Sequence, residues 1–130
     1  MCAYVYIRCI IYLKYIHQVI EMKVAVIGSR TINSIPLETY LPPETTELVS
    51  GGAKGVDQCA ETYAAVHQIK LTVFLPDYAR YRRGAPLRRN RQIVDYSDLV
   101  LAFWDGSSRG TGYTVDYCRT AGKAVQVILL

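Results

Sequence analysis

The chain has 130 residues, of which 51% are hydrophobic and 20% are charged, and its formal net charge is +4. This length suits one domain that can bury its own core, and the composition excludes the disordered and fibrous classes. The charge excess is local, because six arginines lie between residues 80 and 91 while the rest of the chain has nine basic and 11 acidic residues. A generally basic protein is therefore excluded, and the arginine cluster indicates a localised anionic partner, with a solvated loop as the alternative.

Residues 1–22 form the first segment, which we interpret as an N-terminal extension of unassigned role. The segment is rich in tyrosine and isoleucine, but Arg8 and Lys14 interrupt its apolar run. This excludes a membrane-spanning helix and fits a secretory signal poorly. The apolar residues match both helical and strand periodicity, so the type of element stays open. We expect the domain itself to cover residues 23–130.

Short runs of β-branched and aromatic residues predict five strands, at residues 23–27, 47–50, 71–75, 98–104 and 124–130. Their near-continuous apolar character favours strands that are covered on both faces. Helical periodicity predicts helices at residues 56–69, 86–97 and 111–121. Strands that alternate with helices predict a single three-layer α/β domain of Rossmann type, with a mainly parallel sheet of about five strands.

The four cysteines, Cys2, Cys9, Cys59 and Cys118, form no CxxC pair and have no disulfide-like spacing. We therefore expect reduced thiols in a cytoplasmic protein, with neither a metal site nor a cofactor. Cys59 and Cys118 stand among helical apolar positions, which predicts that both are small core residues.

Four unusual segments follow the first four predicted strands: GSRT (28–31), SGGAKGVD (50–57), PDYARYRRG (76–84) and DGSSRGT (105–111). In open parallel sheets, ligands bind outside the carboxyl ends of the strands. Turns rich in glycine and hydroxyl residues expose backbone N–H groups to an anion, and the following helix adds its positive end. We expect the four turns to converge on a phosphate-bearing ligand.

Several other functions are excluded by motif. The sequence GSSRG (106–110) matches the GxSxG nucleophile elbow, but no histidine follows His67, so a catalytic triad is rejected. The chain has no GxGxxG, no GxxxxGK[ST] and no HExxH. Standard dinucleotide-dependent dehydrogenases, P-loop nucleotide hydrolases and HExxH metalloproteases are therefore excluded.

The segments VAVIGSR, LVSGGAKGVDQCA, PLRRNRQIVDYSDLVLAFW and GSSRGTGYTVDYCRTAGKAVQVI, in this order, resemble the SLOG superfamily over residues 22–130. That group includes the DNA-processing protein DprA and the LOG cytokinin-activating phosphoribohydrolases, and the likeness is greatest to its small stand-alone YpsA-related members. The resemblance implies a Rossmann-like fold that binds a nucleotide or nucleotide-derived ligand across the strand ends, often as a dimer. We therefore expect a homo-oligomer.

Carried over by position, the resemblance implies a ligand site made of Gly28, Ser29, Arg30, Ser50, Gly51, Gly52, Lys54, Gly55, Asp57, Arg89, Asn90, Ser107, Ser108, Gly110 and Thr111. Asp57 would cap the following helix or contact a sugar hydroxyl. Arg89 matches the catalytic arginine of LOG-type enzymes, but their catalytic glutamate falls at Thr114. Asp116 is a poor substitute for it, since Asp116 lies about 200° further round the helix.

Three functions remain open. The first is a binding protein that senses or sequesters AMP, ADP-ribose, NAD or a cyclic nucleotide without converting it. The second is hydrolysis of an N-glycosidic bond, with Arg89 and one of Asp57, Asp105 or Asp116 as catalytic candidates. The third is single-stranded DNA binding, which tyrosines among the arginines at residues 78–83 would favour and the negative remainder of the chain disfavours.

Overall fold

A computed structural model describes residues 21–130, so the proposed extension at residues 1–22 lies outside the described residues except for its last two positions. The elements follow one another as β1 (Lys23–Gly28), α2 (Leu37–Tyr40), β2 (Glu47–Ser50), α3 (Val56–His67), β3 (Lys70–Val73), α4 (Tyr78–Tyr81), η1 (Arg82–Gly84), α5 (Ala85–Tyr96), β4 (Leu99–Trp104), α6 (Arg109–Ala121) and β5 (Ala124–Leu129). Within residues 21–130, no helix is long and apolar enough to cross a membrane.

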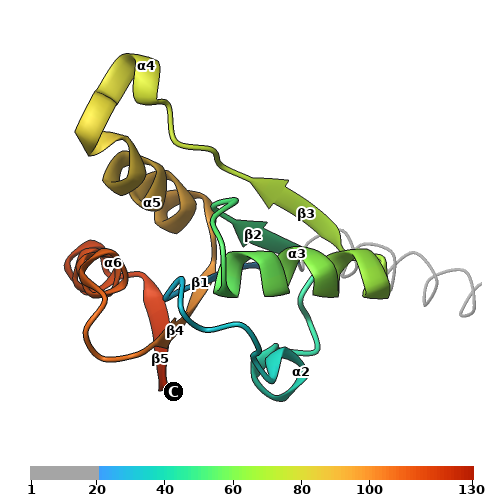
Figure 1. Cartoon of the computed structure of the whole chain (residues 1–130). Helices are drawn as coiled ribbons and strands as arrows, with labels where there is room; N and C mark the ends of the chain where they lie inside the picture. Colours follow the sequence, from blue (N-terminus) through green and yellow to red (C-terminus); the bar gives the residue numbers. More distant parts are fainter. Residues whose placement is uncertain (1–20) are drawn as a thin grey trace, which may run out of the picture.

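The five strands form one sheet in the order β3-β2-β1-β4-β5, and all four pairings are parallel (Figure 1). This confirms the predicted α/β fold with a parallel sheet. The chain winds outward from β1 through β2 to β3, then returns to the other side of β1 to form β4. The carboxyl ends of β1 and β4 therefore flank the switch point, where open α/β sheets bind their ligands.

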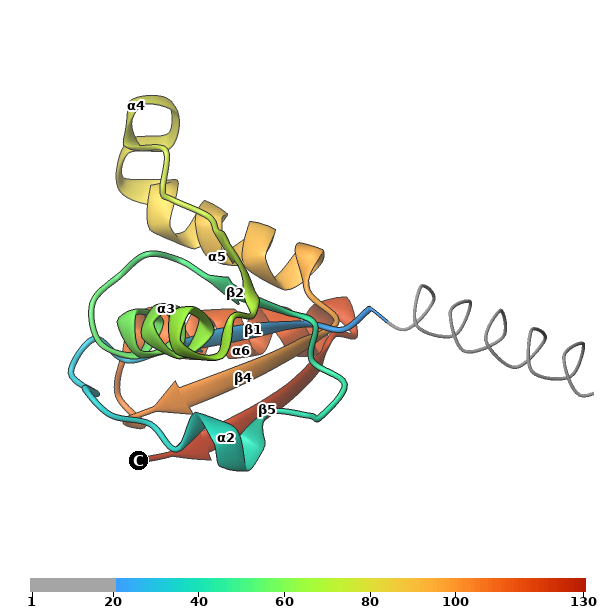
Figure 2. The same ribbon diagram turned by 90° about the vertical axis from the view of Figure 1, so that its right-hand side faces the viewer.

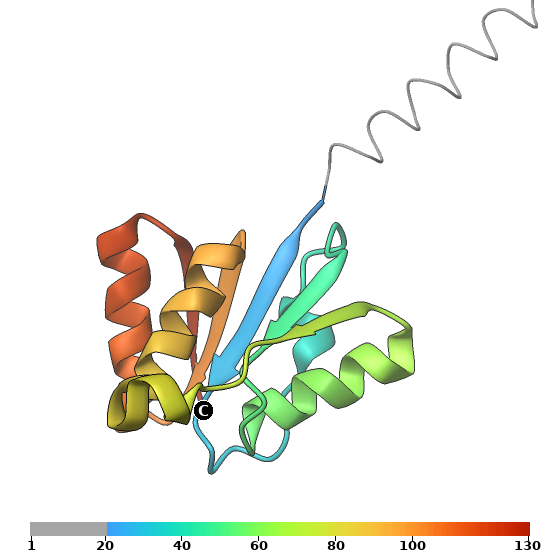
Figure 3. The same cartoon turned by 90° about the horizontal axis from the view of Figure 1, so that it is seen from above.

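Helices cover both faces of the sheet, as the view in Figure 3 shows. On one face, Val24 and Val26 of β1 join a core with α2 and α3. On the other face, Ala25 and Ile27 join a second core with α5 and α6. The alternation follows from the two-residue period of a strand, and it confirms the three-layer arrangement.

The expectation that all five strands are covered on both faces is wrong for the two outer strands. In β3, Lys70 and Val73 are exposed, and in β5 Gln126 and Leu129 are exposed. Each outer strand has one neighbouring strand only, which leaves its outer edge without a partner strand. The outer strands are apolar without being buried, so their composition does not distinguish them from the central three.

The segment after β3 is the main departure from the predicted elements. The sequence pattern predicts a turn at residues 76–84, whereas the chain forms α4 and η1, which project from the body beyond the start of α5 (Figures 1 and 2). The Arg80 and Arg88 guanidinium carbons lie 5.2 and 4.6 Å from the centre of the Tyr81 ring. Three of the six clustered arginines therefore lie on this projection, and Arg88 of α5 packs against it.

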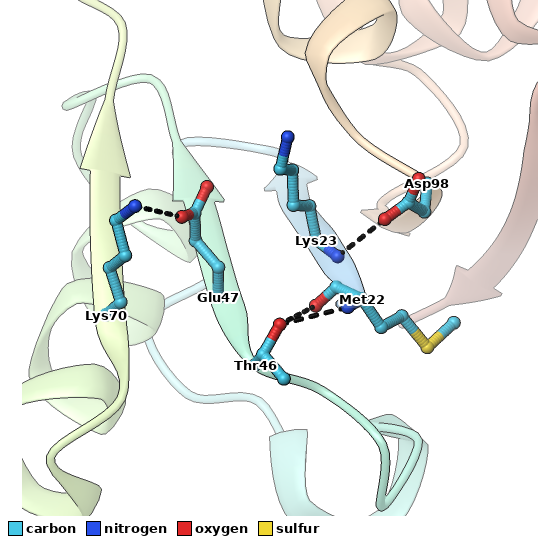
Figure 4. Close-up of polar contacts among 6 residues, drawn as sticks. All are labelled: Met22, Lys23, Thr46, Glu47, Lys70 and Asp98. Carbon is cyan, nitrogen blue, oxygen red and sulfur yellow. Dashed lines mark hydrogen bonds and ion pairs between the residues drawn. The ribbon is translucent and has the colours of Figure 1, made fainter. Parts of the chain in front are cut away.

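At the amino end of the sheet, polar contacts join the start of β1 to the residues just before β2 and β4 (Figure 4). The backbone N–H of Lys23 donates to Asp98 Oδ2 at 2.9 Å, and that of Met22 donates to Thr46 Oγ1 at 2.9 Å. Glu47 is buried, and its Oε1 lies 2.9 Å from the exposed Lys70 Nζ. Its Oε2 makes no hydrogen bond of good geometry with residues 21–130.

Replacing Glu47 by glutamine is expected to weaken the fold only where the carboxyl is charged. Burial raises the pKa of Glu47, but the approach of the Tyr96 hydroxyl and the contact with Lys70 outweigh it, so the pKa lies below its usual 4.5. A lowered pKa contributes stability above pH 4.5 that is lost as the pH falls through the folded-state value. In urea unfolding, Glu47→Gln should therefore be less stable than wild type at pH 7, and the gap should close toward pH 3. Glu44→Gln, at an exposed position before the same strand, is the control; a gap that widens in acid would contradict the assignment.

Candidate ligand-binding site

A pocket of about 330 Å³ lies at the carboxyl ends of β1 and β4, and we call it the central pocket. Its lining comes from residues 27–31, from Ala53 and Asp57, from residues 86–93 of α5 and from residues 105–114 around the start of α6. Three of the four predicted turns thus meet at the switch point of the sheet, because parallel strands deliver their carboxyl ends to one edge.

A second pocket of about 310 Å³ adjoins the first, and we call it the glycine-loop pocket. It is lined by Arg30, Gly51, Gly52, Ala53, Lys54, Pro76, Tyr78 and Arg89. Arg30, Ala53 and Arg89 line both pockets, so the two form neighbouring parts of one site. The turn at residues 76–84 contributes to the site only through Pro76 and Tyr78.

Arg89 is the buried cation of this site, with 6% of its surface exposed. It lies on the buried stripe of α5 between Ala85 and Ile93, and its Nη1 donates to the carbonyl of Gly51. Its Nε donates to Asn90 Oδ1 at 2.8 Å, while its Nη2 makes no hydrogen bond with residues 21–130. Burial lowers the pKa of Arg89, and the charge of Arg30 adds to this, while the charge of Asp57 opposes it.

Asp57 faces the same region from the first turn of α3, with 7% of its surface exposed. Its Oδ2 accepts the backbone N–H of Ala53 at 3.1 Å, and this bond holds the glycine turn against α3. Asp57 therefore does not cap α3, whose N-cap residue is Gly55. Burial raises the pKa of the Asp57 carboxyl, although the Ala53 N–H and the charge of Arg89 oppose that change. The neutral, protonated form therefore persists to a higher pH than in an exposed aspartate.

Gly51 separates the two charged side chains. A methyl group there would stand 2.8 Å from Arg89 Nη1 and 2.9 Å from Asp57 Oδ2, so the residue must be glycine for both to keep their places. The turn does not present a row of free N–H groups, because Gly52 donates to Ser50 Oγ and Ala53 to Asp57. Those two N–H groups hold the turn's own shape, contrary to the expectation that its backbone is exposed to an anion.

The turn after β4 is organised by Asp105. Its Oδ1 accepts the backbone N–H groups of Ser107 and Ser108 at 2.9 and 2.8 Å, and these bonds lower the pKa of Asp105. Its backbone N–H donates to Ser29 Oγ at 3.2 Å, which joins this turn to the one after β1. The start of α6 follows directly and has no side-chain cap. The carboxylate therefore stands at the positive end of a 13-residue helix.

Most residues that the sequence assigned to the ligand site line one of the two pockets: Gly28, Ser29, Arg30, Gly51, Gly52, Lys54, Asp57, Arg89, Asn90, Ser108, Gly110 and Thr111. Ser50, Gly55 and Ser107 line neither. Ser50 is buried below the turn, where its hydroxyl donates to Glu61 Oε1 at 3.3 Å. Gly55 holds the start of α3 with φ at 77°, and Ser107 is exposed beside Asp105.

Two further expectations need correction. Asp116 is exposed on α6, with Arg119 Nη1 at 4.0 Å, and lines neither pocket, as its place on the far side of the helix requires. Of the six clustered arginines, Arg89 alone lines these pockets. The others lie on the projection or on the outer surface of α5, where Arg91 Nε donates to the Tyr113 hydroxyl at 2.7 Å.

One lining residue was identified from the sequence only as the position of the missing glutamate and was not assigned to the ligand site. Thr114 is 1% exposed, lines the central pocket and donates to the carbonyl of Gly110 at 2.8 Å. Its spacing of three from Thr111 on one helix is the signal that could have found it. Phe103 belongs to the core, and Trp104 donates its indole N–H to the carbonyl of Ser108 at 2.9 Å, so neither ring lines these pockets.

A larger groove of about 530 Å³ runs along the outer face of α3, away from the strand ends. It contains Cys59, whose Sγ donates to the carbonyl of Asn33 at 3.1 Å, so Cys59 is a groove residue while Cys118 lies in the core as expected. In the part of the chain that the structure describes, no lysine or arginine lines this groove. Within residues 21–130, no group of three or more histidine, cysteine or acidic side chains is placed to hold a metal ion. The two strand-end pockets are therefore the better site for an anionic ligand.

No protein-family model matches the chain, and neither a curated protein nor a solved structure does.

Proposed function

We propose that the protein binds a nucleotide or nucleotide-derived phosphate ligand at the carboxyl ends of its strands, to sense or sequester it. The observation that carries the proposal is Arg89, a buried guanidinium without an ion pair among residues 21–130. A buried charge is costly unless an opposite charge compensates for it. The charge of the nearby Asp57 acts on Arg89, but the two side chains form no ion pair within 4.0 Å. A phosphate can supply the missing negative charge.

The surroundings of Arg89 support a ligand larger than a simple anion. Ser108 and Thr111 bring hydroxyl groups to the central pocket, and Leu87 and Ile93 bring apolar surface. This mixture suits a sugar and a base joined to a phosphate. The motif resemblance to the SLOG superfamily supports the same proposal, and we include membership of that group in it.

Isothermal titration calorimetry on the full chain tests the proposal, with AMP, ADP-ribose, NAD and cyclic nucleotides as ligands and adenosine as the uncharged comparison. We expect at least one phosphate-bearing ligand to bind at least tenfold more tightly than adenosine, since hydrogen bonds to a charged group are worth about 1.5–3 kcal/mol. Mass spectrometry of ligand released from natively purified protein would identify a bound species directly. A flat titration with every member of the panel, from protein shown to be folded and empty, would refute the proposal.

Hydrolysis of an N-glycosidic bond is a second candidate, favoured by one observation. Asp57 is a carboxyl in the central pocket whose pKa is raised by burial, as general acids require. The other expected acid/base position is occupied by Thr114, which has no ionisable group. Chromatography of the same ligand mixtures for free base tests this candidate. Product that disappears in Asp57→Asn supports it, and binding without product leaves the binding function alone.

A further inference from the structure

The two pockets differ in charge, and this difference gives the ligand a direction. We infer that the ligand carries a terminal phosphate and a free sugar hydroxyl, and that it binds in one orientation, with the phosphate in the glycine-loop pocket and the sugar hydroxyl against Asp105 in the central pocket. This inference rests on the proposed function and specifies its ligand class.

The glycine-loop pocket is the cationic part of the site. Arg30, Lys54 and Arg89 line it, and none of its lining residues between positions 21 and 130 is a carboxylate. Arg30 lies near enough to Arg89 for the positive charge of Arg30 to lower the pKa of Arg89. None of these three cations forms an ion pair within residues 21–130. The N–H groups of Gly52 and Ala53 are already used inside the turn, so the three side-chain cations supply the positive charge with which this pocket can recognise an anion.

The central pocket is the part that disfavours a phosphate. Asp57 and Asp105 both line it and offset Arg30 and Arg89, the two cations that it shares with the glycine-loop pocket, whereas Lys54 lines the glycine-loop pocket alone. Bonds from the Ser108 and Ser107 backbones lower the pKa of Asp105, so it is charged at neutral pH, and its position at the start of α6 compensates the positive end of that helix. A phosphate dianion placed there would meet a like charge at short range.

A sugar hydroxyl suits the same position. Asp105 Oδ2 accepts the Thr31 hydroxyl at 3.4 Å, a long hydrogen bond that leaves acceptor capacity on this oxygen. Asp105 is exposed, so a ligand can reach it. Arg89 lines both pockets and can contact the ligand where the phosphate joins the sugar.

Two charge-removing variants distinguish this orientation from its reverse. Lys54→Met removes a cation from the glycine-loop pocket, whereas Arg109→Met removes an exposed cation at the start of α6 that lines neither pocket. By calorimetry, Lys54→Met should weaken AMP binding roughly tenfold and leave adenosine unchanged, and Arg109→Met should change AMP binding less than about twofold. Equal losses of AMP affinity in both variants would show that only the overall charge of the protein matters. A loss of AMP affinity in Arg109→Met alone would place the phosphate near the start of α6 instead. Either result overturns the inference.

A separate experiment tests the proposed contact between the sugar hydroxyl of the ligand and Asp105. Asp105→Asn keeps the shape of the side chain and an oxygen that can accept from Ser107 and Ser108, but removes the charge. We expect wild type to prefer AMP over its 2′,3′-dideoxy analogue at least fivefold, and Asp105→Asn to lose most of that preference while binding the dideoxy analogue as wild type does. An unchanged preference overturns the assignment of Asp105. Wild-type protein that binds neither AMP nor any other nucleotide of the panel refutes the proposed function itself, which is a separate outcome.

Discussion

Replacing Gly28 by alanine is expected to lower the free energy of unfolding by about 3 kcal/mol, the upper end of the roughly 1–3 kcal/mol that overpacking typically costs. The added methyl carbon would stand 2.3 Å from the carbonyl oxygen of Phe103 and 2.6 Å from Val56 Cγ2. That carbonyl accepts the N–H of Ser29 and joins β1 to β4, while Val56 begins α3. Neither neighbour is a flexible chain end, so sheet and helix would have to move apart.

Urea unfolding followed by far-ultraviolet circular dichroism measures the effect, and the thermal midpoint should fall by roughly 10 °C. Gly84→Ala is the matched control. Gly84 has φ at −80°, and a methyl group there meets no heavy atom within 4 Å. It should leave stability unchanged or raise it by about 0.5 kcal/mol, because alanine restricts the unfolded chain. Equal stability of the two variants would show that Gly28 has room for a side chain.

Replacing Arg89 by methionine is expected to reduce phosphate-ligand affinity by roughly a hundredfold, the worth of about two charge-assisted hydrogen bonds. The same change should lower the free energy of unfolding without ligand by only about 1–3 kcal/mol, the cost of leaving the Gly51 carbonyl without its hydrogen bond, because Arg89 has no ion-pair partner among residues 21–130 that its loss would leave unpaired. We expect a large effect on ligand affinity and a small effect on stability, because the buried guanidinium lines both pockets and forms no ion pair within residues 21–130. Calorimetry and urea unfolding on the same preparation measure them.

Arg88→Met is the matched control on the same helix. Arg88 is exposed, lies over the Tyr81 ring and lines neither pocket, so its loss should change affinity by less than about twofold. A large loss of stability in Arg89→Met with unchanged affinity would make Arg89 a structural residue. Similar losses of affinity in both variants would attribute binding to the overall charge of the arginine cluster.

The sequence predicts the central strands well because their residues are apolar on both faces, and it predicts the long helices because their apolar residues recur at helical spacing. The strand predicted at residues 23–27 matches β1 within one residue, and the helix predicted at residues 86–97 matches α5 equally closely. The order of the strands in the sheet could not be predicted from the sequence. It depends on whether each connecting segment places the next strand on one side of β1 or on the other, and no residue pattern indicates which. The four-residue helices at Leu37–Tyr40 and Tyr78–Tyr81 were missed because they are too short to show a period.

The candidate site was predictable where it follows from topology. The turns after β1, β2 and β4 meet because parallel strands share an edge, and glycine marks two close approaches, at Gly28 and Gly51. The role of the arginine cluster was not predictable from its charge alone. Arg89 is distinguished by its spacing of four from Ala85 and from Ile93, which puts it on the buried stripe of α5. The position of Arg89 along the helix therefore predicts its burial at the site, which the charge of the arginine cluster does not.

The central position of β1 also has a consequence for how the chain folds. β1 pairs with β2 on one side and with β4 on the other, yet β4 begins only at Leu99. During synthesis, one edge of this apolar strand therefore stays without its partner until most of the chain has left the ribosome, and such edges invite pairing with other chains. The closing of β4 onto β1 is a contact of long sequence separation, and it also brings the turns after these two strands together. A nascent or truncated chain that ends before residue 99 would lack both this pairing and the residues from 105 to 114 that line the central pocket, so only a chain that has closed β4 onto β1 can form that pocket.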